Sequence, residues 1–160
     1  MFEAAIVAFE PSAGAVDLRG VPILVDSEDF EGIRIAASNL ATDLEEVTGV
    51  KSCLWTDVKQ EQQPRESLIL VGSLERSRFV RTLVSGGKLD VNKIEGKWEA
   101  FTTSVQEDSP FASVKRVVVI AGSDKRGTIF GIYTLSEQIG VSPYMFQLPL
   151  LCYCRCSLQI

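Results

Sequence analysis

The sequence predicts one α/β domain, with a mixed β-sheet and about three helices packed on it. Apolar strand-like runs alternate along the chain with amphipathic helical stretches, an order typical of helices layered on a sheet. A continuous β-branched run at 116–121 favours a central strand that is covered on both faces. The chain has 160 residues, 46% of them hydrophobic and 23% charged, which is enough for one globular core.

The first part of the chain is expected to contain two strands and a long helix. Residues 2–9 and 21–25 are apolar runs, separated by turn residues at 11–14. The stretch 26–29, Asp-Ser-Glu-Asp, supplies capping side chains and negative charge for a helix N-terminus. Gly49 is expected to end that helix. Its apolar stripe, spaced by fours and threes, consists of Ile33, Ala37, Leu40, Leu44 and Val47.

The middle of the chain is predicted to add strands and a second helix. Residues 53–55 and 67–71 are strand-like, and 98–105 alternates as a strand should. Gly72-Ser73 is expected to cap the second helix, and Gly86-Gly87 to end it. The apolar side of that helix consists of Phe79, Val80, Leu83 and Val84.

A glycine turn after the run at 116–121 opens the last helix, which is expected over 127–139. The turn comes close to the phosphate-binding pattern G-x4-G-K-[ST], but Thr128 stands where the lysine is required. Asp124 breaks the dinucleotide-binding pattern G-x-G-x-x-G and would repel a phosphate. We therefore predict no nucleotide and no other cofactor.

Packing explains most of this turn. Asp124 is expected to cap the helix, and Gly127 and Gly131 to form a small-residue face against the sheet, with Gly122 as a further structural turn residue. Packing does not explain the charges of Asp124, Lys125 and Arg126. They follow the carboxyl end of a central strand, where open α/β sheets tend to bind ligands. These three are the candidate substrate-binding residues, with a solvated turn as the alternative interpretation.

Composition excludes several kinds of chemistry. The formal net charge of −5 argues against a nucleic-acid or anionic-membrane partner, since either needs clustered cations. Histidine is absent, so Ser–His or Cys–His catalysis and His-ligated zinc are impossible within this chain. Cys152, Cys154 and Cys156 lack the usual C-x2-C spacing, and we predict no metal site. No basic leader and no apolar run of ~18 residues is present, so neither a signal peptide nor a membrane span is predicted and the compartment is left open.

Residues 121–143, together with 23–49 and 69–84, carry a further signal. These three stretches resemble the N-terminal domain of glycoside hydrolase family 115, the xylan α-1,2-glucuronidases. The most specific is "AGSDKRGTIFGIYTLSEQIGVSP" at the end of that domain. "ILVDSEDFEGIRIAASNLATDLEEVTG" is similar to its first helix, and "ILVGSLERSRFVRTLV" to its second. The resemblance covers about Pro22 to Pro143, most of the chain.

This resemblance implies an accessory module over residues 1–143 rather than a complete enzyme. In that family, and in related α-glucuronidases and hexosaminidases, such a domain precedes a (β/α)8 barrel that carries the catalytic acid and the substrate-binding residues. A barrel takes about 250 residues, more than follow Pro143 here. The resemblance therefore implies that the barrel is the missing partner, that xylan-type carbohydrate is reached through it, and that this chain holds no catalytic residue.

Residues 144–160 depart from the family pattern. They form an apolar, cysteine-rich tail in place of the tryptophan-rich entry to a barrel. We expect this tail to come from an altered reading frame or an unspliced intron.

Two alternative functions remain open. The chain could be a free-standing module that binds sugar or a small anion, with Trp55, Trp98 and Tyr133 as stacking surfaces, although such residues are more often part of the core. It could instead be a structural fragment with an orphaned apolar interface. The acidic clusters at 28–29, 43–46 and 107–108 show no cleft context, so we assign none of them to catalysis.

Overall fold

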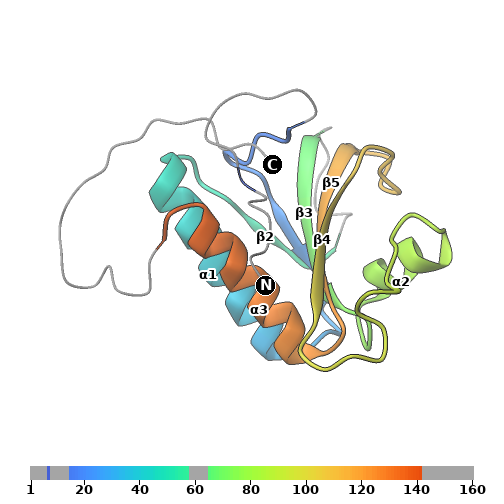
Figure 1. Cartoon of the computed structure of the whole chain (residues 1–160). Helices are drawn as coiled ribbons and strands as arrows, with labels where there is room; N and C mark the ends of the chain where they lie inside the picture. The colour runs from blue at the N-terminus through green and yellow to red at the C-terminus, as the bar shows by residue number, and fades with distance from the viewer. Residues whose placement is uncertain (1–6, 8–14, 58–64, 142–160) are drawn as a thin grey trace.

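The computed structural model describes residues 7, 15–57 and 65–141, which form a single α/β domain with a five-stranded mixed sheet and three helices. The predicted fold class is confirmed (Figure 1). The strands are β1 (Ile23–Val25), β2 (Leu54–Trp55), β3 (Arg65–Ser73), β4 (Phe101–Gln106) and β5 (Val114–Gly122). The helices are α1 (Glu31–Thr48), α2 (Arg78–Ser85) and α3 (Lys125–Gln138).

The sheet has the strand order β2-β1-β3-β5-β4. The pairs β1–β2, β1–β3 and β3–β5 are parallel, whereas β4 runs antiparallel to β5. The chain therefore leaves β3, forms α2, lays β4 at the edge of the sheet, and returns with β5 into the space between β3 and β4. This is a mostly parallel sheet with one antiparallel edge strand, a common arrangement for α/β domains.

The helices cover both faces of the sheet. α1 and α3 lie side by side on one face, and α2 lies on the other (Figure 1). Alternate residues of β3 serve the two faces: Ile69 and Val71 join the core under α1 and α3, while Leu68 and Leu70 join the core under α2. This alternation follows from the two-residue period of a strand.

The central position of β5 is confirmed. Residues 117–121 are fully buried, with 0% of their surface exposed. Burying a valine or isoleucine side chain stabilises the fold by roughly 1.5–3 kcal/mol relative to leaving it exposed. This run is therefore one of the main contributors to the core.

Two glycines of α3 are confirmed as packing positions. A Cβ atom on Gly127 would lie 2.3 Å from the carbonyl oxygen of Ala100, and one on Gly131 would lie 2.7 Å from Ile120 Cγ2 and 2.9 Å from Phe101 Cδ2. Both distances are shorter than side chains tolerate. The absence of side chains here lets α3 approach β5 and the start of β4 closely.

Gly122 is likewise confirmed as a structural turn residue. A Cβ atom on Gly122 would lie 2.2 Å from the backbone nitrogen of Thr128. A second close approach exists at the end of β3, where a Cβ on Gly72 would meet the side chain of Ser77 at 2.5 Å. Each glycine lets the chain pass directly from a strand into the following helix.

The expected caps need correction at two helices. The residue that precedes α1 is Phe30, which makes no side-chain capping bond, so Asp26 and Asp29 do not cap the helix that follows them. α2 is capped by Ser77, which accepts a hydrogen bond from Val80 N, and not by Ser73. The sequence predicts capping of the nearest helix, whereas in the structure Asp26 bonds to Arg78, and Asp29 and Ser73 bond to each other.

The expected ends of the helices are mostly confirmed. Gly49 ends α1 in the left-handed conformation with φ of 71°, and its N–H donates to Glu45 O. α2 ends at Gly86, and Asp124 caps α3 as expected. The strand expected over 98–105 begins only at Phe101.

Two predicted segments lie outside the described residues. They are the strand at 2–9, of which only the buried Val7 is described, and the cysteine-rich tail at 144–160. Among the helices in the described ranges, none is both long and apolar enough to cross a membrane.

Candidate functional site

The predicted site residues lie at the edge of the sheet where β1, β3 and β5 end, which we call the carboxyl edge. Asp26 follows β1, Ser73 ends β3, and Asp124 follows β5 by two residues. All three helices also begin here. Their partly positive N-termini favour the carboxylates that gather at this edge.

Asp26 connects β1 to α2. Its side chain is fully buried and forms an ion pair with Arg78, with Arg78 Nη2 2.8 Å from Oδ1 and Nε 2.9 Å from Oδ2. The backbone N–H groups of Glu28 and Arg78 also donate to it, at 3.0 and 2.7 Å. Burial by itself raises the pKa of Asp26, but the Arg78 side chain and the two backbone donors together outweigh burial and hold that pKa below its usual value.

Asp29 connects the same loop to β3. Its Oδ1 accepts a hydrogen bond from Ser73 Oγ at 2.7 Å and one from Phe30 N at 2.8 Å. Its Oδ2 accepts one from Ser73 N at 2.8 Å. Both of these buried acids are therefore engaged by donors of the fold itself.

Asp124 also acts as a structural acceptor. Its Oδ1 accepts from Gly127 N at 2.7 Å, which caps α3, and its Oδ2 accepts from Glu99 N at 2.9 Å. Partial burial raises the pKa of Asp124, but the backbone donors Glu99, Gly127 and Arg126 and the charge of Arg126 lower it overall. The carboxylate stays ionised and holds the loop before β4 against the start of α3.

Lys125 and Arg126 are both exposed but differ in their partners. Arg126 Nη1 lies 2.8 Å from Glu99 Oε1, and its guanidinium stands 5.8 Å from the ring centre of Phe130. Lys125 lies over Gly32 of α1 and has no ion-pair partner in the described part of the chain. The structure thus brings the three predicted residues together in space, with Lys125 as the only cation of the three that remains available to an external anion.

The loop before β4 displays a tryptophan. Trp98 is 89% exposed, so its expected place in the core is wrong, whereas Trp55 is buried as expected. Glu99 beside it has φ of 54°, a left-handed conformation that a non-glycine residue rarely adopts. The Asp124 and Arg126 contacts to Glu99 hold this conformation and therefore fix the base of the Trp98 loop.

Three large apolar side chains are exposed on the adjacent helices α1 and α3. They are Ile35, Phe130 and Tyr133, which are 56%, 43% and 45% exposed, and we call these three the outer seam. Asn39 Nδ2 donates to the Tyr133 hydroxyl at 3.2 Å, which joins the two helices across the seam. Large exposed apolar side chains that gather on neighbouring helices are typical of an interaction surface.

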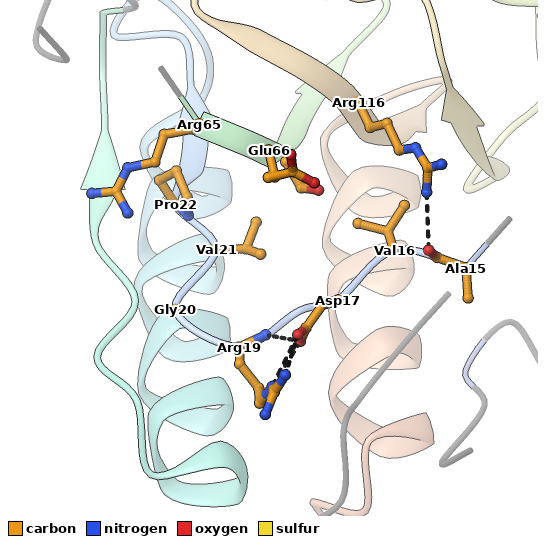
Figure 2. Close-up of a pocket in the computed structure, with 11 residues that line it drawn as sticks. Ala15, Val16, Asp17, Arg19, Gly20, Val21, Pro22, Arg65, Glu66 and Arg116 are labelled. Atoms are coloured by element: carbon orange, nitrogen blue, oxygen red, sulfur yellow. Dashed lines mark hydrogen bonds and ion pairs between the residues drawn. The ribbon is translucent and has the colours of Figure 1, made fainter. Parts of the chain in front are cut away.

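A hollow of about 540 Å³ lies at the opposite end of the sheet, where the parallel strands begin. Residues 15–17, 19–22, 65–67 and 116 line it, and we call it the amino-edge hollow (Figure 2). Figure 2 shows the Asp17–Arg19 pair along one side and Arg65, Glu66 and Arg116 along the other. No local pattern in the sequence predicts this site, because it forms only when segment 15–22 folds over the starts of β3 and β5.

The two acids of the hollow are both paired with cations. Asp17 lies 2.5 Å from Arg19 Nη2, and Glu66 lies 2.6 Å from Lys115 Nζ. The hydrogen bonds from Arg19 lower the pKa of Asp17, and that from Lys115 lowers the pKa of Glu66. A glycosidase acid needs a raised pKa so that it carries a proton near neutral pH. Neither residue meets that requirement.

Metal ligands do not gather in the described ranges. No group of three or more Cys, Asp or Glu side chains within residues 15–57 and 65–141 could hold a metal ion. Cys53 is a free, exposed thiol, and the other three cysteines lie outside the described residues.

Comparison with known proteins places the fold among parts of glycoside hydrolases. It is similar to part of a family GH115 4-O-methyl-alpha-glucuronidase with specificity for decorated arabinogalactans. The TM-score is 0.62 and the sequence identity 26%, over 82% of this chain and 15% of that chain. It is also similar to part of CpGH84D, with a TM-score of 0.53 and 13% identity over 96% of this chain and 22% of that one. No protein-family model and no curated protein matches the sequence.

The similarity to the family GH115 enzyme indicates a glycosidase-related domain. The match to CpGH84D concerns the fold alone, because the identity is low. The chain spans less than a quarter of the length of either solved protein, so in both of them this fold is one part of a much longer polypeptide.

Proposed function

We propose that the chain is a non-catalytic accessory domain of an α-glucuronidase-like glycoside hydrolase of family 115. The observation that carries the proposal is the match to a 4-O-methyl-alpha-glucuronidase over 82% of this chain but only 15% of that enzyme. The independent resemblance of the 121–143 stretch to the same family supports it. The reaction itself belongs to a neighbouring domain, for which a (β/α)8 barrel is the expected partner.

The state of the acids supports a non-catalytic role. Glycoside hydrolysis needs two carboxyl groups that face each other across a cleft, one of them protonated. The buried acids Asp26 and Asp29 are bound by Arg78 and Ser73, respectively. Asp17, which is half-buried, and Glu66, which is exposed, are both ion-paired, and their lowered pKa values keep them ionised.

The outer seam is the proposed docking surface for the neighbouring domain of the longer polypeptide. Its three large apolar side chains would be costly to leave in water, and a packed partner would remove them from solvent. Lys125 and Arg126 begin the same helix that carries Phe130 and Tyr133. We propose that these two cations lie at the rim of that interface, where Lys125 pairs with the carboxylate of a uronate substrate bound to the partner while Arg126 stays paired with Glu99.

The substrate is proposed to be a polysaccharide side chain that ends in 4-O-methylglucuronic acid. Glucuronoxylan is the substrate that the family resemblance implies, and decorated arabinogalactan is the one printed for the similar enzyme. Both belong in the test for that reason.

The direct test is hydrolysis by the isolated chain. Purified protein is incubated with glucuronoxylan and, separately, with arabinogalactan, and free 4-O-methylglucuronic acid is measured by anion-exchange chromatography. A complete family GH115 enzyme is the positive control. We expect no release above the buffer blank. Release that grows with the concentration of this protein and survives repurification would overturn the proposal.

A second candidate function is a carbohydrate-binding module, which the amino-edge hollow favours. Its lining combines guanidinium groups, carboxylates and a small apolar wall, which is the mixture that a charged sugar requires. The two functions are compatible, because an accessory domain can hold substrate for its neighbour.

A further inference from the structure

We infer that the amino-edge hollow binds the carboxylate of a uronic acid, as a sugar site separate from the carboxyl edge. The choice of ligand rests on the proposed function, whereas the place of the site rests on the geometry described here. The hollow opens on the α1 and α3 face of the sheet, at the start of β3 and β5 (Figure 2). Its volume of about 540 Å³ falls within the range of small-ligand pockets and admits one or two sugar rings.

Arg116 is the group that points to an anion. It is half-buried on β5 and donates from Nη1 to the carbonyl oxygen of Ala15 at 3.0 Å. That acceptor is neutral, and Arg116 has no ion-pair partner within the described ranges. A guanidinium has five N–H donors in a planar fork that matches a carboxylate. The remaining donors of Arg116 are therefore suited to a ligand carboxylate.

Ser67 adds a hydroxyl to the same wall. It is 9% exposed, and it pairs in register with Arg116 on the neighbouring strand. It lines the hollow, and its side chain makes no hydrogen bond to the described residues. Its hydroxyl can therefore bond a ligand there.

Asp17 helps to decide what kind of anion fits. It is held ionised by Arg19, so its carboxylate is an acceptor that needs hydroxyl donors, whereas Glu66 alternates with Ser67 along β3 and pairs with Lys115 on the α2 face. This acceptor favours a ligand with hydroxyl donors over inorganic phosphate, which carries more charge and has fewer donors. A sugar acid brings one carboxylate for Arg116 and a hydroxyl donor for Asp17. Val21 and Pro22 supply an apolar surface for the C–H groups of the ring.

The test is an amide-resolved NMR titration of the purified chain with sodium glucuronate. Sodium acetate, glucose and sodium phosphate are titrated under the same salt and pH. We expect saturable glucuronate shifts at the amides of Val16, Gly20, Ser67 and Arg116, with weaker effects from the other three ligands. Equal or larger effects from acetate, glucose or phosphate would overturn the inference. So would the absence of saturable shifts, or shifts centred on Lys125 at the carboxyl edge.

Two variants sharpen the result. Arg116→Gln removes the fork and is expected to weaken glucuronate binding by about tenfold or more. Arg81→Gln is the matched control, since Arg81 is an exposed arginine on α2, on the opposite face of the sheet. Unchanged affinity in folded Arg116→Gln protein would contradict the inference. If that variant does not fold, the wild-type shift map alone decides.

Failure of this inference can be told apart from failure of the proposed function. If the chain binds no glucuronate and releases no uronic acid, the inferred sugar site is wrong and the proposed accessory role stands. If the chain releases uronic acid, the proposed accessory role is wrong, whatever the chain binds.

Discussion

Asp26 and Arg78, 52 positions apart in the sequence, form a two-pronged ion pair that fastens the end of β1 to the first turn of α2. The carboxylate is fully buried, while the arginine side chain is 57% exposed. Removal of this buried carboxylate takes away the acceptor of two backbone N–H groups and breaks the charge-assisted bonds from Arg78, whose exposed guanidinium then turns to water.

Asp26→Ala is therefore expected to lower the free energy of unfolding by about 3 kcal/mol, because charge-assisted hydrogen bonds to a buried group are lost. Urea denaturation followed by circular dichroism measures the change. Ser27→Ala, at the exposed neighbouring position, is the control and should change stability by less than about 0.5 kcal/mol. Equal stability of the two variants would show that the ion pair contributes nothing.

Lowering the pH should destabilise the protein, because Asp26 becomes protonated. The pKa of Asp26 is lower in the folded state than the value of about 3.9 expected when unfolded, so the folded state binds fewer protons. Its contribution is complete above about pH 4 and is lost as the pH falls through the folded pKa. The unfolding free energy measured from pH 6 down to pH 2 should therefore fall less steeply in Asp26→Asn than in the wild type. Parallel curves would contradict this assignment.

The cap of α3 gives a separate prediction. Asp124→Ala removes the acceptor of Gly127 N and Glu99 N and should cost about 1–2 kcal/mol. Asp124→Asn keeps a capping oxygen and should restore most of the loss. Thermal unfolding of the two variants provides the comparison. An Asn variant as unstable as the Ala variant would mean that charge, rather than capping, carries the effect.

Replacement of Gly127 or Gly32, each in the first turn of a helix, by alanine should change the stability of the protein in opposite directions. Gly127→Ala places a methyl group 2.3 Å from the backbone oxygen of Ala100, so it should destabilise the protein by several kcal/mol, on the order of other overpacked sites. Gly32→Ala meets only the flexible end of Lys125, at 2.8 Å, and should be neutral or stabilise α1 by up to about 1 kcal/mol. Melting temperatures distinguish the two, and a tolerated Gly127→Ala would refute the packing role.

The outer seam predicts self-association of the isolated chain. Light scattering at rising concentration should show an increase in average mass, because the seam has no partner. Ile35→Lys combined with Phe130→Lys should reduce that increase with little loss of stability, since both side chains are largely exposed. Thr82→Lys combined with Ser85→Lys, both at exposed positions of α2, is the control for two added positive charges elsewhere. A strictly monomeric wild-type protein at high concentration would argue against the seam as a docking surface.

Local patterns in the sequence were sufficient for the fold class. The stripe of α1 and the buried run of β5 depend on residues near one another in the chain, and both are confirmed. The partners of Asp26 and Asp29 are 52 and 44 positions away, so the sequence pointed to the nearer helix instead. The exposure of Trp98 also depends on residues distant in the sequence. Its neighbour Glu99 is held by Asp124 and Arg126, so local patterns do not predict where Trp98 lies.

The candidate site was only half predictable. Asp124, Lys125 and Arg126 were placed correctly at the end of a central strand, because parallel strands bring their carboxyl ends to one edge. Their role as substrate contacts stays a prediction. The amino-edge hollow depends on contact between Arg116 and Ala15, which are 101 positions apart in the sequence, and no sequence motif predicts such a contact.

The insertion of β5 between β3 and β4 has a consequence for how the protein is made. While the ribosome is still producing the segment after α2, one side of β3 has backbone groups with no neighbouring strand, and these stay open until Val114–Gly122 emerges. Pairing across such a sequence separation is slow compared with local helix formation. The newborn chain therefore passes through a stage at which chaperones, or strands from other copies, compete for the place that β5 will occupy.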